Sequence, residues 1–242
     1  MLAAGVFAGA INTVVGSGTL VTFPVLLAVG YSPVVANVSN TLGLVPGSVS
    51  GAIGYREELA GQRRRALVLA SASLVGGITG AVLLLSLPGS AFEAIVPALI
   101  AIALVLVVLQ PRLARVLAAR RPARPHGGPT LWAGVFATGI YGGYFGAAQG
   151  VILLALLGIT IPSEDLQRLN ALKNVLAGLV NGVAAVVFVF FASVAWLPAL
   201  LLAAGSAAGG QLGARIGRSL SQPVLRGVIV VVGVAAIVQL LA

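Results

Sequence analysis

Apolar residues follow one another in long runs along this chain, and glycine, proline or charged residues interrupt the runs. A helix needs about 20 mostly apolar residues to cross the hydrocarbon core of a bilayer. Residues 1–55 carry no charge and are long enough for two such segments, separated by Tyr31-Ser32-Pro33. The other runs cover residues 66–87, 94–110, 131–159, 166–191, 196–216 and 224–242. The pattern predicts an all-α polytopic membrane protein with eight hydrophobic segments.

A stretch rich in arginine, proline and glycine, residues 111–130, divides these segments into two groups of four. We therefore expect three parts: a first membrane repeat over residues 1–110, a basic linker over 111–130 and a second membrane repeat over 131–242. The linker is expected to lie in the cytoplasm, because arginines that flank apolar segments mark cytoplasmic loops.

Composition agrees with a membrane location. Hydrophobic residues make up 59% and charged residues 8% of the 242 positions, against about 45–50% and about 25% in soluble domains. The net charge of +9 comes mostly from clustered arginines: Arg56, Arg63, Arg64, Arg65, Arg112, Arg115, Arg120, Arg121 and Arg124. These clusters adjoin membrane segments, so we expect a multi-pass protein of the cytoplasmic membrane that contacts the lipid bilayer and binds no nucleic acid.

The two groups of segments are alike in sequence. Gly5-Val-Phe-Ala opens the first and Gly134-Val-Phe-Ala opens the second, and a glycine-containing break follows each after about ten residues. The breaks are Val15-Gly16-Ser17-Gly18 and Phe145-Gly146-Ala147-Ala148-Gln149-Gly150. A polar patch follows in the next segment, where a spacing of 134 residues aligns Asn40 with Asn174. These matches favour an internal repeat over chance likeness.

The broken first segment of each half has two interpretations. It crosses the membrane once with an unwound centre, or it enters and leaves on the same face. If all eight segments cross, Arg215 and Arg218 lie outside the cell, against the positive-inside rule. If both broken segments are re-entrant, each half crosses three times, Arg168 joins these arginines inside, and Glu93 lies outside. The halves are then inverted, a plan found in transporters with substrate sites at broken helices. We favour this plan and leave the other open.

Both breaks are candidate binding sites. Non-helical backbone at membrane depth is tolerated only inside protein or beside a water-filled cavity, and a helix that begins there points N–H groups at a small anion. The candidate residues are Gly16, Ser17, Gly18, Thr19, Gly146, Gln149 and Gly150. Glycines also allow membrane helices to pack closely, and we assign that role to Gly76, Gly77, Gly80, Gly205, Gly209, Gly210 and Gly213.

Lys173 is the only lysine of the chain and lies seven residues inside its segment. A charge at such a position marks function, and a cation there would attract an anionic substrate. The alternative is that the side chain reaches the cytoplasmic interface. Asn40 and Asn174 complete the predicted site, although both could instead hydrogen-bond to neighbouring helices.

Little in the sequence suggests catalysis. There is no cysteine, the single histidine is His126 in the linker, and the five acidic residues lie near segment ends. A phosphate-binding loop is also missing, because Gly16-Ser-Gly is not followed by Lys-Ser/Thr. We therefore expect no metal, no cofactor and no enzymatic activity.

The motifs resemble the sulfite exporter TauE/SafE family along essentially the whole chain. In the first half they are Gly16-Ser-Gly-Thr-Leu-Val-Thr-Phe-Pro, Ser32-Pro-Val-Val-Ala-Asn-Val-Ser-Asn-Thr and Pro46-Gly-Ser-Val-Ser-Gly-Ala-Ile-Gly-Tyr55. In the second half they are Gly142-Gly-Tyr-Phe-Gly-Ala-Ala-Gln-Gly150, Asn170-Ala-Leu-Lys-Asn174 and Gly209-Gly-Gln-Leu-Gly-Ala-Arg215. Ser17 and Ala147-Ala148-Gln149 depart from the glycines and small residues that the family tends to have there.

The resemblance implies a secondary transporter that exports sulfite, or a related sulfonate or thiosulfate anion, across the cytoplasmic membrane. The residues themselves indicate only a small-anion transporter with two similar breaks. An anion channel and an importer of organosulfur anions remain as alternatives, and a homodimer is one expectation for the oligomeric state.

Overall fold

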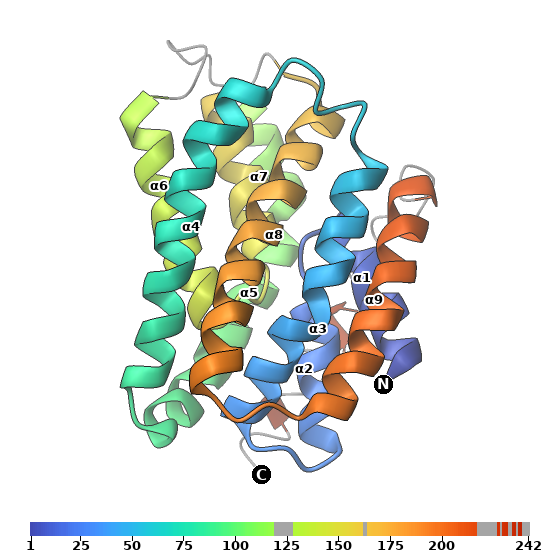
Figure 1. Ribbon diagram of the computed structural model, residues 1–242. Helices are drawn as coiled ribbons and strands as arrows, with labels where there is room; N and C mark the ends of the chain where they lie inside the picture. Colours follow the sequence, from blue (N-terminus) through green and yellow to red (C-terminus); the bar gives the residue numbers. More distant parts are fainter. Residues whose placement is uncertain are drawn as a thin grey trace.

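The apolar runs fold as helices, and most helix boundaries coincide with glycine, proline or polar residues. The computed structural model describes residues 1–118, 128–161 and 164–216, with positions 227, 229–231, 234–235 and 237–238. The helices with assigned bounds are α1 (Leu2–Val14), α2 (Thr19–Ala28), α3 (Pro33–Gly54), α4 (Arg63–Ser86), α5 (Gly89–Ala118), α6 (Gly128–Tyr144), α7 (Gln149–Thr160), α8 (Leu166–Phe191) and α9 (Trp196–Ile216) (Figure 1). The described residues include no strand, as the sequence predicts.

The described helices differ both in length and in how apolar they are. Among the described residues, four helices are long and apolar enough to cross a membrane: Arg63–Ser86, Gly89–Leu109, Leu166–Phe191 and Trp196–Ile216. The apolar helices α1, α2 and α7 have 13, 10 and 12 residues. At 1.5 Å per residue each reaches about half to two thirds of the roughly 30 Å of a hydrocarbon core. The described chain is therefore an all-α polytopic membrane protein, and α1, α2 and α7 are each shorter than the hydrocarbon core is thick.

The three short helices, together with α6, form two hairpins. The chain reverses after α1, so that a Cβ built on Gly18 would lie 2.6 Å from the carbonyl oxygen of Ala8. The chain also reverses after α6, and Gly134 near the start of α6 faces the side chain of Leu156 in α7. In Figure 1, α1 and α2 return to the end of the bundle where the N-terminus lies, and α6 and α7 return to the opposite end.

Glycines allow each hairpin to pack tightly against a long helix of the other half. A Cβ on Gly209 of α9 would lie 2.0 Å from the carbonyl oxygen of Val6 in α1, and one on Gly80 of α4 would lie 2.0 Å from that of Ile140 in α6. The other glycines assigned to packing have similarly close neighbours: Gly76, Gly77, Gly205, Gly210 and Gly213. The packing role predicted for these glycines is confirmed. Helix α9 packs closely against α1, and α4 packs closely against α6.

The arginines predicted to share one face gather at one end of the bundle. Arg65 at the start of α4 and Arg168 at the start of α8 both bind Glu164, and Arg215 lies in the last turn of α9, beside the end of α3. Glu93 lies in the first turns of α5, at the other end (Figure 1).

Some sequence predictions concern residues outside the described ranges. These are His126, Arg120, Arg121, Arg124, Arg218 and most of the segment 224–242. Helix α5 extends to Ala118 and α6 begins at Gly128. Residues 111–118 and 128–130 of the predicted linker are therefore helical. The three-part division of the chain stays a prediction.

Candidate anion-binding site

The two hairpin tips have the same local geometry. At the end of α1, the N–H groups of Val15 and Gly16 both donate to the carbonyl oxygen of Ile11, over 2.7 and 3.1 Å. At the end of α6, the N–H groups of Phe145 and Gly146 both donate to the carbonyl oxygen of Tyr141, over 2.9 and 3.1 Å. Gly16 has φ +86° and Gly146 has φ +74°. Only glycine adopts this backbone without strain, so these two residues end the helices and turn the chain.

The tips touch each other through their backbones. The N–H of Gly150 donates to the carbonyl oxygen of Gly16 over 3.0 Å, and a Cβ on either glycine would lie 2.4 Å from the Cα of the other. No side chain fits between them. Residues 15–18 and 145–148 are not helical, whereas Gln149 and Gly150 lie in the first turn of α7. The break of the second half is thus shorter than the sequence suggested.

Three side chains of α8 bind the end of α1. The ammonium of Lys173 donates to the carbonyl oxygens of Asn12 and Thr13 over 3.1 and 3.0 Å, and the amides of Asn170 and Asn174 donate to Thr13 over 3.3 Å each. The last carbonyls of a helix lack partners within the helix and carry partial negative charge, so they suit a cation. Lys173 is fully buried, which excludes the alternative that it reaches the interface.

The tip of α6 receives a similar contact from the first half. Asn37 of α3 donates through Nδ2 to the carbonyl oxygen of Tyr144, the last residue of α6, over 2.9 Å. A helix of each half therefore binds the hairpin tip of the other half with an asparagine amide. Ser39, 134 residues before Lys173, does not take the corresponding role at the α6 tip within the described chain. Its hydroxyl accepts a hydrogen bond from the N–H of Ala195 over 2.9 Å.

Asn40 has a different role from its aligned partner Asn174. Its Nδ2 donates to Thr19 Oγ1 over 3.2 Å, and its Oδ1 accepts from the hydroxyl of Thr22. Both threonines belong to α2, so Asn40 and Thr19 hold α2 against α3. Lys173 and Asn174 therefore meet at the end of α1, whereas the Asn40 side chain binds α2 instead.

Several buried polar atoms at the tips have no hydrogen-bond partner within the described chain. Ser17 and Gln149 are 1% and 3% exposed, yet Ser17 Oγ and Gln149 Nε2 are unpaired. The other such atoms of this region are Thr13 Oγ1, Asn37 Oδ1, Tyr144 OH and Asn170 Oδ1. Unpaired buried polar groups are rare and often mark the position of a ligand or water. Gly18 contributes an N–H that donates to Asn12 Oδ1 over a long 3.4 Å.

Asn12 and Thr13 supply both carbonyls that Lys173 binds, and neither was among the site residues predicted from the sequence. The available signal was their position: they form a polar pair in an uncharged apolar segment, directly before the first break. Asn37 and Asn170 stood in the recognised polar patches but were not among the predicted site residues.

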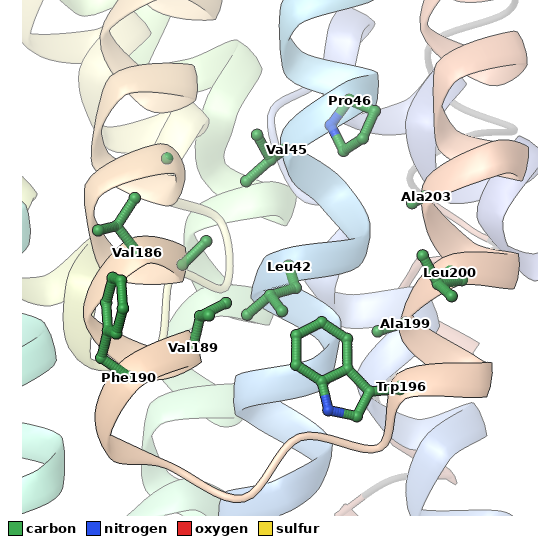
Figure 2. A pocket seen from close by; sticks show the side chains of 12 residues that line it. Leu42, Val45, Pro46, Val186, Val189, Phe190, Trp196, Ala199, Leu200 and Ala203 are labelled. Atoms are coloured by element: carbon green, nitrogen blue, oxygen red, sulfur yellow. The ribbon is translucent and has the colours of Figure 1, made fainter.

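An apolar groove elsewhere on the bundle does not suit an anion. It has a volume of about 370 Å³ and lies between α3, α8 and α9, with Leu42, Val186, Phe190 and Trp196 among its walls (Figure 2). Its walls are almost wholly apolar, and Phe190 is 75% exposed. In a membrane this groove would face acyl chains.

Comparison with known proteins identifies the family. The model of the sulfite exporter TauE/SafE family matches residues 1–240. The chain belongs to this family. It is 28% identical over 235 residues to the probable membrane transporter protein YfcA of Escherichia coli K12, covering 97% of this chain and 86% of the relative. It is 30% identical over 249 residues to the probable membrane transporter protein ORF9 of Sinorhizobium sp, covering 100% and 91%.

A third relative, a probable membrane transporter protein of Haemophilus influenzae, is 25% identical over 230 residues, covering 94% of this chain and 88% of the relative. No solved structure matches the chain. Membership of the TauE/SafE family, with its apolar helices, makes this chain a multi-pass membrane transporter.

Proposed function

We propose that this TauE/SafE protein is a secondary transporter that exports sulfite, or a related sulfonate or thiosulfate anion, across the cytoplasmic membrane. The description of the family supports the sulfur anion, while the relatives are named only as probable membrane transporters. The observation that carries the proposal is the contact of two hairpin tips beside the fully buried Lys173. A buried ammonium and unpaired polar groups at broken helices suit a small anion.

The proposed site lies where the two tips meet. The N–H groups of Gly18 and Gly150 face this region, but they donate to Asn12 Oδ1 and to Gly16 O. The anion would replace both bonds as the tips part. Hydrogen bonds to a charged acceptor are roughly twice as strong as those between neutral groups, so the exchange favours binding. Ser17 and Gln149 would add donors without giving up a partner.

Lys173 would supply positive charge to the same site. An ammonium has three N–H donors, and two of them bind the end of α1. Asn174 would keep the lysine and the α1 tip in place, and Gly146 would allow the turn that presents the second tip. The carbonyls of α1 offset part of the lysine charge, so the ammonium would attract the anion without holding it too tightly for release.

We further propose that the two halves are inverted repeats and that the arginine-rich end faces the cytoplasm. Three observations support this: the hairpins return to opposite ends of the bundle (Figure 1), their tips share one turn geometry, and each tip is bound by the other half. Rocking of one half against the other would open the meeting point of the tips to each side in turn. In such a carrier the backbone contact between Gly16 and Gly150 would break and form again in each transport cycle.

Flux of radiolabelled sulfite into proteoliposomes tests the function, with sulfate, thiosulfate, taurine and chloride as competitors. A carrier for sulfur anions shows saturable uptake and counterflow, with stronger competition from thiosulfate or taurine than from chloride. Uptake that never saturates would point to a channel, and the absence of sulfite-dependent flux in protein that is correctly folded would refute the proposed substrate.

A further inference from the structure

A second pocket lies at the arginine-rich end, away from the hairpin tips. It has a volume of about 350 Å³ and lies between the first turns of α4 and α6. Its walls combine two arginines with apolar and backbone groups: Arg64, Arg65, Val68, Leu69, Gly128 and Trp132.

The pocket carries an excess of positive charge. Helix α4 begins with Arg63, Arg64 and Arg65, and neither α4 nor α6 has an acidic residue in its first turn. The N-termini of both helices add partial positive charge, because their first N–H groups lack helical partners. Glu164 pairs with Arg65 over 3.0 Å, whereas Arg64 is exposed and forms no ion pair within the described chain. Cations at a helix N-terminus repel the helix dipole, so an anion in the pocket would relieve this repulsion.

The walls of the pocket continue along the outer surface of the bundle. Leu67, Val68 and Val75 of α4 are 63%, 54% and 51% exposed. The indole N–H of Trp132 donates to Ser71 Oγ over 3.0 Å, and its ring stacks on Phe136 with centroids 5.6 Å apart. Tryptophan is enriched at the level of lipid headgroups. A positive end joined to an exposed apolar wall matches a molecule with an anionic head and an apolar tail.

We propose that this pocket binds the headgroup phosphate of an anionic phospholipid. The Arg64 guanidinium would bind two phosphate oxygens, and the acyl chains would lie along the exposed face of α4. The first N–H groups of α4 would face the same phosphate, with those of Gly128 and Thr130 in α6, because Pro129 between them has no N–H. Basic pockets between membrane helices bind anionic headgroups in this way. The inference rests on the membrane location of the chain and is independent of the transported anion.

Fluorescence of Trp132 tests the proposal directly. The chain has two tryptophans, and Trp196 lies in the groove at the other end of the bundle, so Trp196→Phe leaves Trp132 as the only indole. The purified full chain in neutral detergent is titrated with short-chain phosphatidylglycerol, with phosphatidylcholine of the same chain length and with inorganic phosphate. We expect a saturable change with phosphatidylglycerol alone. An equal response to phosphatidylcholine, or to inorganic phosphate, would overturn the lipid assignment.

A matched pair of arginine variants separates a defined site from general surface charge. Arg64→Gln should weaken phosphatidylglycerol binding by about tenfold, because it removes a charge-assisted contact. Arg56→Gln removes the same charge from an exposed position at the same end of the bundle, outside the pocket, and should change affinity less than about twofold. Arg64→Lys keeps the charge but not the two-point contact, so its affinity should fall between those of the unmodified protein and Arg64→Gln. Equal losses in Arg64→Gln and Arg56→Gln would show that no specific site exists.

Discussion

The N–H of Gly150 donates a hydrogen bond to the carbonyl oxygen of Gly16 over 3.0 Å, and no side chain lies between the two residues. Through this bond the tips of two hairpins from opposite halves of the chain meet backbone to backbone. The unpaired side chains of Ser17 and Gln149 and the buried ammonium of Lys173 belong to the same region. The contact is therefore the point at which changes in sequence should affect transport most directly.

Adding a methyl group at the contact should block transport. A Cβ on Gly150 would lie 2.4 Å from Gly16 Cα, and overpacking costs about 1–3 kcal/mol. We expect Gly150→Ala to reduce sulfite flux in proteoliposomes by about tenfold or more. Gly158→Ala is the control, because a Cβ on this glycine of the same helix meets nothing within 4 Å. Equal flux in both variants would place the transport path elsewhere.

Removing the lysine charge should reduce both anion affinity and stability. Lys173→Met leaves the carbonyls of Asn12 and Thr13 without their strongest donor and removes the ammonium from the site. We expect sulfite affinity to weaken by about 1.5–3 kcal/mol, the range for bonds to charged groups. Lys173→Arg should replace the lysine poorly, because its planar fork does not replace a compact ammonium. Competition binding gives the affinity, and thermal unfolding in detergent gives the stability. A loss of stability with unchanged affinity would make the lysine an anchor of α1 only.

Ser17→Ala should weaken binding without loss of stability. The Ser17 hydroxyl is buried and unpaired, so its removal breaks no hydrogen bond of the described protein, whereas a bond to an anion contributes about 1.5–3 kcal/mol. Ser73→Ala is a matched control, since its hydroxyl in α4 is also buried and unpaired. Both variants should unfold near the temperature of the unmodified protein, and only Ser17→Ala should show weaker sulfite competition. Identical behaviour of the two serines would remove Ser17 from the site.

The Glu164 ion pairs should make stability depend on pH. Hydrogen bonds from Arg168 and Arg65 lower the pKa of Glu164 below its usual value, and the Arg168 bond has the largest effect. A carboxylate with a lowered pKa in the folded protein stabilises it above the pKa of the unfolded chain and loses this effect as the pH falls through the folded value. Glu164→Gln should therefore lower the unfolding temperature at pH 7, by a few degrees at most for about 1 kcal/mol. The difference should shrink below about pH 4, under the usual glutamate pKa. A difference that is constant from pH 7 to pH 3 would contradict this account.

Cysteine labelling tests whether the first hairpin is re-entrant. The chain has no cysteine, so single cysteines can be placed at Leu2 and Val29, which are 52% and 61% exposed, and at the exposed Ala60. An impermeant reagent should label Leu2→Cys and Val29→Cys from the same side of the membrane. Ala60→Cys should be labelled only from the opposite side. Labelling of Leu2→Cys and Val29→Cys from opposite sides would show that the broken segment crosses the membrane once.

Local chemistry explains what the sequence alone determined. Runs of apolar residues without charges specify membrane helices whatever their neighbours, and a glycine with positive φ ends a helix through its own backbone freedom. The all-α membrane class, the breaks at Gly16 and Gly146 and the packing role of Gly80 and Gly209 were therefore predictable. The resemblance to the TauE/SafE family was also visible in motifs that extend along the chain.

Pairing over long distances explains what only the tertiary structure decided. Lys173 and Thr13 are 160 residues apart, and Asn37 and Tyr144 are 107 apart. A local pattern shows that such side chains are polar and lie within apolar segments, but not which helix end they meet. Asn40 and Asn174 align in the sequence, yet one binds the threonines of α2 and the other the end of α1. Their partners depend on how the two hairpins insert between the long helices, and that arrangement comes from packing of the whole chain.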